Sequence, residues 1–181
     1  MVYKLLFLIL PVLLSGLSFI LFLKFNKHAL NYPLDFGRKW REKRLFGENK
    51  TIKGPIFMGF ITMVWGFFTY LLLEGGLYVK TSYLQVLHNF LFIGIVYSLG
   101  ELPNSFIKRQ LAIPPGKVHP KNPIKHVFKF TDTFDSLIAV GIAYYFLFNI
   151  PITTILIAIM IGGFFHLMTD KLMIKLKLKT T

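Results

Sequence analysis

The chain has 181 residues, of which 54% are hydrophobic, and it carries a formal charge of +13 at pH 7. The few remaining polar residues cannot cover the surface of a soluble domain of this size, which excludes an ordinary soluble protein. The absence of cysteine excludes disulfides, thiolate catalysis and cysteine metal sites.

Blocks of apolar residues predict an all-α integral membrane protein with about five transmembrane helices. A bilayer core of about 30 Å requires roughly 17–25 apolar residues per helix. Four blocks reach or approach that length, and the short fourth block is counted as a span because of its neighbours. The predicted spans are 3–23, 55–73, 84–99, 136–148 and 150–168. The first lacks a small-residue cleavage pattern, so we expect a retained helix, and a single transmembrane domain over 1–181.

Positive charge is concentrated in three segments of the chain. Residues 24–53, 108–129 and 171–179 hold 19 of the 21 lysines and arginines. With five spans all three segments face the same side, which the positive-inside rule identifies as the cytoplasm. We therefore expect a multi-pass cell-membrane protein with its N-terminus outside and its C-terminus in the cytoplasm. This distribution also argues against a nucleic-acid partner, which such a charge would suggest in a soluble protein.

Two cytoplasmic loops, 24–54 and 101–131, are predicted between the spans, and loops of this length are usually functional or disordered. At the end of the first loop, glycines flank a Lys-Thr pair just before a helix. Glycine allows close approach to an anion, and helix N-terminal amides and lysine stabilise phosphate charge. The alternative is a basic loop resting on anionic lipid head groups, and the Walker spacing is absent. The candidate phosphate-binding residues are Gly47, Lys50, Thr51, Lys53 and Gly54.

The second loop begins with a cluster that could also bind phosphate. Glu101 and Ser105 are followed by the adjacent pair Lys108 and Arg109, which combines a compact charge with a planar donor fork. The alternative is the basic cluster that any cytoplasmic helix end tends to carry.

Asp132 and Asp135 precede the fourth span with an i, i+3 spacing that places both carboxylates on one helical face. They could be helix caps, but two carboxylates at a membrane edge are costly and favour a functional site. Mg²⁺ typically binds one or two carboxylates together with substrate phosphates. The histidines form no metal motif, although His166 near the inner end of the last span could meet the site.

Taken together and in this order, these segments resemble the CDP-archaeol synthase family, which is related to the phosphatidate cytidylyltransferases. The chain differs at Glu101, where the family usually has Asp, at Thr133, where it has Gln, and at Asp170, where it has Asn. The matching positions are Pro33, Asp35, Gly37, Gly47, Lys50, Thr51, Gly54, Gly100, Ser105, Phe106, Lys108, Arg109, Gly116, Asp132 and Asp135.

The resemblance implies a membrane cytidylyltransferase that transfers CMP from CTP to a lipid phosphate, giving CDP-lipid and pyrophosphate. It implies Mg²⁺ held by Asp132 and Asp135 with Glu101, and CTP bound by the first-loop candidates and Ser105. The implied catalytic residues are Lys108, Arg109, Asp132 and Asp135.

Two alternatives remain open, a non-catalytic membrane lipid-binding or transport protein and a CDP-alcohol phosphatidyltransferase, although the D-G-x-x-A-R signature of the latter is absent. The sequence leaves the lipid class and the oligomeric state open.

Overall fold

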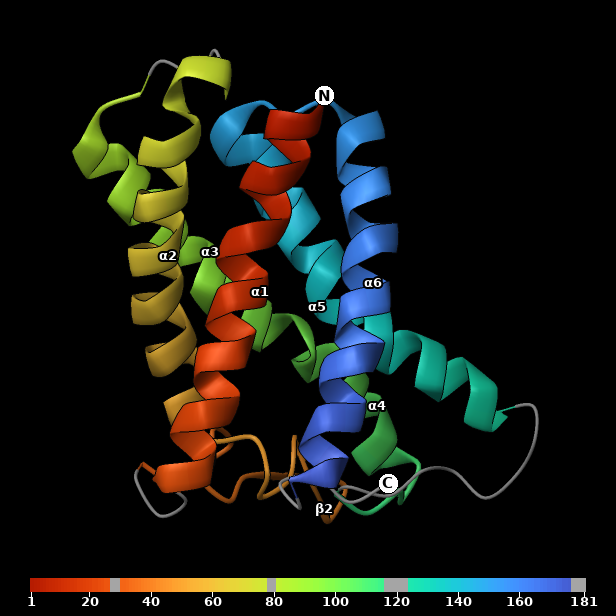
Figure 1. Ribbon diagram of the computed structural model, residues 1–181. Helices are drawn as coiled ribbons and strands as arrows, with labels where there is room; N and C mark the ends of the chain where they lie inside the picture. Colours follow the sequence, from red (N-terminus) through yellow and green to blue (C-terminus); the bar gives the residue numbers. More distant parts are fainter. Residues whose placement is uncertain (27–29, 78–80, 116–123, 177–181) are drawn as a thin grey trace.

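The described residues form a bundle of five long helices, with a short helix and a small hairpin at one end (Figure 1). The computed structural model describes residues 1–26, 30–77, 81–115 and 124–176; the matching position Gly116 lies outside them. The elements are α1 (Val2–Phe25), β1 (Lys39–Trp40), β2 (Lys43–Arg44), α2 (Lys53–Leu77), α3 (Tyr83–Gly100), α4 (Leu102–Gln110), α5 (Ile124–Phe148) and α6 (Ile152–Lys175).

The chain crosses the bundle five times. In Figure 1, α1, α3 and α6 run toward the end that carries the hairpin, and α2 and α5 run back. Among the residues described, four helical segments are long and apolar enough to cross a membrane, namely Val2–Phe25, Lys53–Leu73, Tyr83–Gln110 and Ile152–Lys175. The crossing by α5 is not among them because four charged residues precede its apolar run at 136–148. The prediction of an all-α membrane protein is confirmed.

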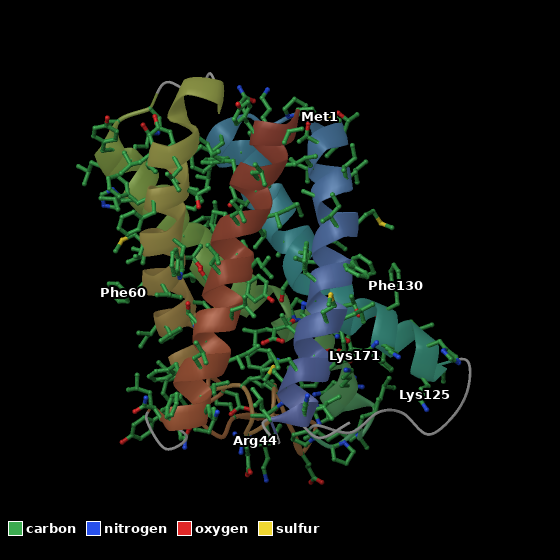
Figure 2. The ribbon with its side chains drawn as sticks, in the orientation of Figure 1. Met1, Arg44, Phe60, Lys125, Phe130 and Lys171 are labelled. Carbon is green, nitrogen blue, oxygen red and sulfur yellow. The ribbon has the colours of Figure 1, made fainter. Side chains whose placement is uncertain are left out.

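The basic residues gather at the end of the bundle remote from the N-terminus. Figure 2 shows Arg44, Lys125 and Lys171 in the half of the molecule away from Met1, whereas Phe60 points outward from the side of the bundle. We call this half the basic end. Its position agrees with the expected clustering of charge on one side of a membrane.

Aromatic rings fill the core near the opposite end. The ring of Phe7 on α1 is fully buried, and its centroid lies 5.3 Å from that of Phe90, 6.0 Å from Tyr144 and 5.0 Å from Phe148. The Tyr144 hydroxyl also donates to the Phe7 carbonyl oxygen at 3.3 Å. Edge-to-face ring contacts of this kind favour one fixed arrangement of α1, α3 and α5.

In the described part of the expected loop 101–131, residues 102–110 and 124–131 are helical, so the prediction of a continuous loop was wrong there, while residues 116–123 lie outside the described residues. α3 runs into α4 with only Glu101 between them, and α5 already begins at Ile124. A further consequence concerns Asp132 and Asp135, which lie within α5 rather than at its start, so they cannot be N-terminal caps. Loop 24–54 contains the β1–β2 hairpin, in which Lys39 pairs with Arg44.

Candidate functional site

A buried carboxylate organises the first loop. Asp35 is 2% exposed and accepts hydrogen bonds from Arg44 Nε at 3.1 Å and Nη2 at 2.5 Å. It also accepts from the backbone amides of Gly37 at 3.0 Å, Phe46 at 3.2 Å and Gly47 at 3.1 Å. Burial alone would raise the pKa of Asp35, but these donors outweigh it and hold that pKa well below its usual value. The carboxylate of Asp35 therefore holds these parts of the first loop together.

The ordered loop docks onto the end of α3 and onto α4. Lys50 Nζ lies 2.6 Å from Glu101 Oε2, and Lys43 Nζ donates to the Gln110 carbonyl oxygen at 2.6 Å. Gly47 has φ +95°, and a Cβ there would lie 3.3 Å from Arg109 Nε. Glycine is required because a side chain would be strained and would crowd the guanidinium. The structure thus brings the predicted residues of the two segments together.

The remaining first-loop candidates lie where α2 begins. A Cβ on Gly54 would approach Ser98 Oγ to 2.7 Å, so the start of α2 packs closely against α3. Lys53 is 7% exposed in this packed region, and Thr51 forms a backbone bridge with Pro33. These residues hold the base of the loop against α3, while Gly47 and Lys50 lie further out, against α4.

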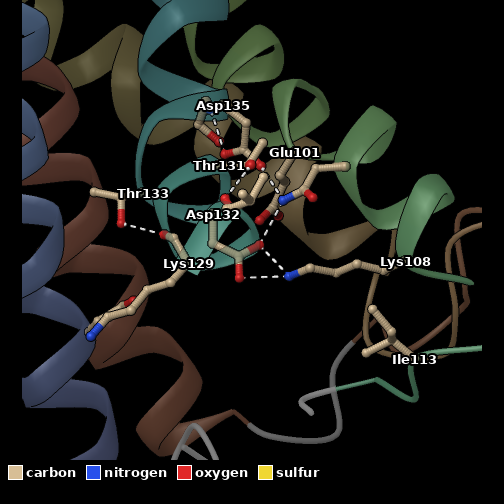
Figure 3. Close-up of polar contacts among 12 residues, drawn as sticks. Glu101, Lys108, Ile113, Lys129, Thr131, Asp132, Thr133 and Asp135 are labelled. Atoms are coloured by element: carbon tan, nitrogen blue, oxygen red, sulfur yellow. Dashed lines mark hydrogen bonds and ion pairs between the residues drawn. The ribbon is translucent and has the colours of Figure 1, made fainter. Parts of the chain in front are cut away.

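Four side chains of α4 and α5 form a cluster of hydrogen bonds and ion pairs, which we call the α4–α5 cluster (Figure 3). Asn104 Nδ2 donates to Asp132 Oδ1 at 2.6 Å and to Asp135 Oδ2 at 3.1 Å. Lys108 Nζ contacts both oxygens of Asp132, with 2.6 Å to Oδ2, and lies 5.4 Å from the centroid of the Phe128 ring. The predicted residues Lys108, Asp132 and Asp135 are thus brought together.

The other predicted second-segment residues lie around this cluster. Ser105 is buried on α4 beside Asn104, and Figure 3 places Glu101 close to the carboxylates. Arg109 is 9% exposed, and its Nη1 donates to the Ile113 carbonyl oxygen. Arg109 Nε is buried without a hydrogen-bond partner among the residues described. The guanidinium therefore retains an unused donor beside Gly47.

The donors of the cluster fit a hard divalent cation. Within the described part of the chain, no three His, Asp or Glu side chains converge as a metal site, so the set of Asp132, Asp135 and Glu101 is not assembled. Asn104 Oδ1, however, is buried without a partner in the described residues. Rotation of this amide would turn its oxygen toward the two carboxylates. Two carboxylates and an amide oxygen are ligands that suit Mg²⁺.

A mainly apolar cavity, partly open to its surroundings, lies near the cluster. One end is polar and is lined by Tyr97, His166 and Thr169. Tyr97 precedes Glu101 by one helical turn, and His166 Nε2 lies 3.9 Å from Asp170 Oδ1. His166 thus lines the same cavity as Tyr97. The apolar wall residues include Leu8, Val12, Leu137, Val140 and Ile159.

Sequence reasoning gave no role to Asn104. It is the residue that joins Asp132 to Asp135, and an isolated asparagine has no recognisable signature. One signal was available, since Asn104 precedes Lys108 by four residues and helical spacing places both on one face.

Comparison with known proteins identifies the family of the chain. The family described as CarS-like, CDP-archaeol synthase, matches residues 1–181. A CDP-archaeol synthase of Pyrobaculum islandicum is 31% identical over 156 residues, covering 85% of this chain and 84% of the relative. Those of Pyrobaculum aerophilum and Pyrococcus furiosus are 31% and 30% identical, covering 82% of this chain and 80% and 81% of the relatives. No solved structure matches the chain. The family match extends over the whole length, and this chain belongs to the CDP-archaeol synthase family.

Proposed function

We propose that the protein transfers CMP from CTP to a lipid phosphate, producing CDP-lipid and pyrophosphate. An oxygen of the lipid phosphate attacks the α-phosphorus of CTP, a P–O bond forms, and the bond to the β-phosphate oxygen breaks. Transfer of this kind depends on positioning the reactants and neutralising phosphate charge. The names of the family and of its relatives support this substrate class.

The observation that carries the proposal is the convergence of cations and carboxylates from three separate segments at the basic end. Lys50 reaches Glu101 from the first loop, and Lys108 reaches Asp132 from α4. Both lysines stand within ion-pair distance of carboxylates, so an incoming triphosphate would exchange with these partners. Arg109, with its unused Nε, contributes a planar fork suited to phosphate oxygens.

Asp132 and Asp135, with Asn104, would hold Mg²⁺ at the cluster. Bound there, the ion would neutralise charge on the phosphates and orient them. Gly47 lets the backbone approach the nucleotide, and Thr51, Lys53, Gly54 and Ser105 maintain the surrounding packing or add polar contacts.

The cavity supports a lipid as the acceptor. Its apolar walls suit a hydrocarbon chain, and its polar end by Tyr97 lies one turn from Glu101. A lipid with one chain there would present its phosphate toward the cluster. A purely transporting or scaffolding protein would not need these features beside a cation–carboxylate cluster, and the family match does not favour a CDP-alcohol phosphatidyltransferase either.

Incubation of purified protein with CTP, Mg²⁺ and a panel of lipid phosphates tests the function, with CDP-lipid detected by mass. The panel includes ether-linked and ester-linked lipid phosphates, with isoprenoid chains and with acyl chains. A matched control is Glu48→Gln, because this glutamate is exposed and its ion pair with Arg44 is long, at 3.6 Å. Absence of product from every acceptor contradicts the proposal.

We place the basic end in the cytoplasm, with the N-terminus outside, by the positive-inside rule. Single cysteines are readily introduced because the chain has none. A membrane-impermeant reagent added outside should label a cysteine at Gly76 and leave one at Lys43 unlabelled. Labelling at position 43 from outside would show that the protein has the opposite orientation.

A further inference from the structure

The first part of α5, residues 124–134, leaves the bundle sideways at the basic end, and we call it the α5 arm. Figure 1 shows it lying across the direction of the long helices, and Figure 2 shows Lys125 and Phe130 beyond the side of the bundle. A bundle that crosses a bilayer has its long axis near the membrane normal. The arm therefore lies close to the plane of the membrane surface.

Three faces of the arm carry three kinds of side chain. Phe128 is 7% exposed and, with Asp132, faces α4, where Lys108 contacts both. Val127 and Phe130 are 61% and 64% exposed and share an outer face, since residues three apart lie on one side of a helix. The third face is basic.

Lys125 and Lys129 form that basic face, and both are exposed. Four residues apart, they lie on one side of the helix, roughly 145° around from the face of Val127 and Phe130 at about 100° per residue. Figure 3 shows the Lys129 side chain directed away from the carboxylates and from Lys108. Lys129 is therefore not directed into the α4–α5 cluster.

The outer apolar face continues along the part of α5 that crosses the bundle. Ile138, Ile142 and Tyr145 are exposed there at the same helical positions. In a membrane protein, exposed apolar side chains on a crossing helix face lipid chains. Between these residues and Phe130 the helix is more buried, and half-buried Phe134 packs against Phe130 with ring centroids 4.6 Å apart. The exposed apolar residues on both parts of α5 indicate that the arm meets the same lipid.

We propose that the α5 arm lies in the interface of the leaflet at the basic end, with Val127 and Phe130 among the lipid chains. Lys125 and Lys129 lie at the level of anionic lipid phosphates. Amphipathic helices with apolar and lysine-rich faces bind membrane interfaces in this way, and each basic residue adds attraction to anionic lipid. The occupant of the exposed face is thus anionic lipid, rather than a protein.

The position of the arm gives the lipid phosphate a route to the cluster. Asp132 lies in the last turn of the arm and Asp135 directly follows it on the same helix, so the cluster lies near the depth of the head groups. A lipid phosphate gathered by Lys125 and Lys129 then needs to move only laterally to reach Lys108. This step rests on the proposed function, whereas the membrane position of the arm does not.

Single-cysteine spin labels measure the position of the arm directly. Labels at Val127, Phe130 and Lys125 are compared in full-length protein in vesicles of equal parts phosphatidylcholine and phosphatidylglycerol. We expect the labels at 127 and 130 to be relaxed more by oxygen than by a water-soluble nickel chelate, and the label at 125 to show the reverse. Equal nickel access at all three positions would overturn the proposal.

The same labels distinguish lipid from a second copy of the chain. If two molecules pair through the apolar face, labels at Phe130 will broaden one another, and dilution with unlabelled protein will remove the broadening. That outcome would overturn the lipid assignment. Size-exclusion profiles and helical content of each labelled variant, matched to those of the unlabelled protein, show that the fold is retained.

Turnover tests the delivery step separately. The double variant Lys125→Gln/Lys129→Gln should raise the apparent KM for a long-chain lipid phosphate in these vesicles severalfold and leave the KM for CTP unchanged. A short-chain, water-soluble analogue should show no difference. If the double variant and the wild-type protein have equal KM values for the long-chain lipid, delivery by the arm is overturned. A wild-type protein that forms no CDP-lipid would contradict the proposed function, and the spin-label result would stand independently.

Discussion

Replacement of Asp35 by alanine tests whether one carboxylate holds the first loop in place. The substitution removes the acceptor of two Arg44 hydrogen bonds and of the amides of Gly37, Phe46 and Gly47. Removing one member of a buried ion pair costs about 3–5 kcal/mol. Since the Arg44 side chain is 26% exposed, water recovers part of this loss. We therefore expect a cost of about 3 kcal/mol, near the lower limit.

The loss should appear as local opening of the loop, because the helices pack independently of Asp35. Hydrogen exchange of the Phe46 and Gly47 amides measures that opening. At about 1.4 kcal/mol for each factor of ten, their exchange should accelerate roughly 100-fold. The KM for CTP should rise as well, because Gly47 and Lys50 lie in the same loop.

The sign of the pH dependence follows from the lowered pKa of Asp35. The stabilisation is complete above the usual pKa of 3.8 and is lost as the pH falls toward the lower value of the folded protein. It is therefore fully present at neutral pH, where the exchange experiment is done. In the control Glu48→Gln, little should change because exposed ion pairs contribute about 0–1 kcal/mol. Unchanged exchange in the alanine variant would refute the assigned role of Asp35.

Three further predictions concern the α4–α5 cluster and the lysines. Asp132→Asn and Asp135→Asn should each nearly abolish CDP-lipid formation in folded protein, and full activity in both would remove the Mg²⁺ assignment. Asn104→Ala should lower kcat about 10–100-fold and weaken the Mg²⁺ dependence of turnover, because losing a metal ligand or a residue that orients one has an effect of this size. An unchanged Mg²⁺ titration would contradict this prediction. Lys50→Ala and Lys108→Ala should combine non-additively in kcat/KM for CTP, because groups acting on one ligand couple. Strict additivity would mean that the two lysines do not share the nucleotide.

Much of the fold could be predicted because apolar runs report directly on burial in lipid. The runs 55–73 and 150–168 fall within α2 and, apart from two residues, within α6. The spacing of Asp132 and Asp135 correctly placed both on one helical face, where Asn104 contacts them. Charge counting likewise predicted the basic end that the bundle displays.

The helical part of segment 101–131 escaped prediction for a physical reason. α4 is short and polar, and the α5 arm alternates apolar and basic residues, so neither contains a continuous apolar run. Their helical character lies in a 3.6-residue period, which a search for spans does not detect. Asp35 matched the family by position, but its role depends on contacts with Arg44 and Gly47, nine and twelve residues away.

The ion pairs of Lys50 with Glu101 and of Lys108 with Asp132 have a consequence for how the site accepts its substrates. These two lysines are already neutralised, so a free phosphate meets balanced charges at both of them rather than open positive ones. A polyanion that arrives with its own divalent cation can replace both partners at once. The lysines then pair with its phosphates, and the carboxylates bind the metal. The affinities for nucleotide and cation are then thermodynamically linked, and each must raise the other by the same factor. Selection of the metal–nucleotide complex over bare phosphate would thus arise from the salt bridges themselves.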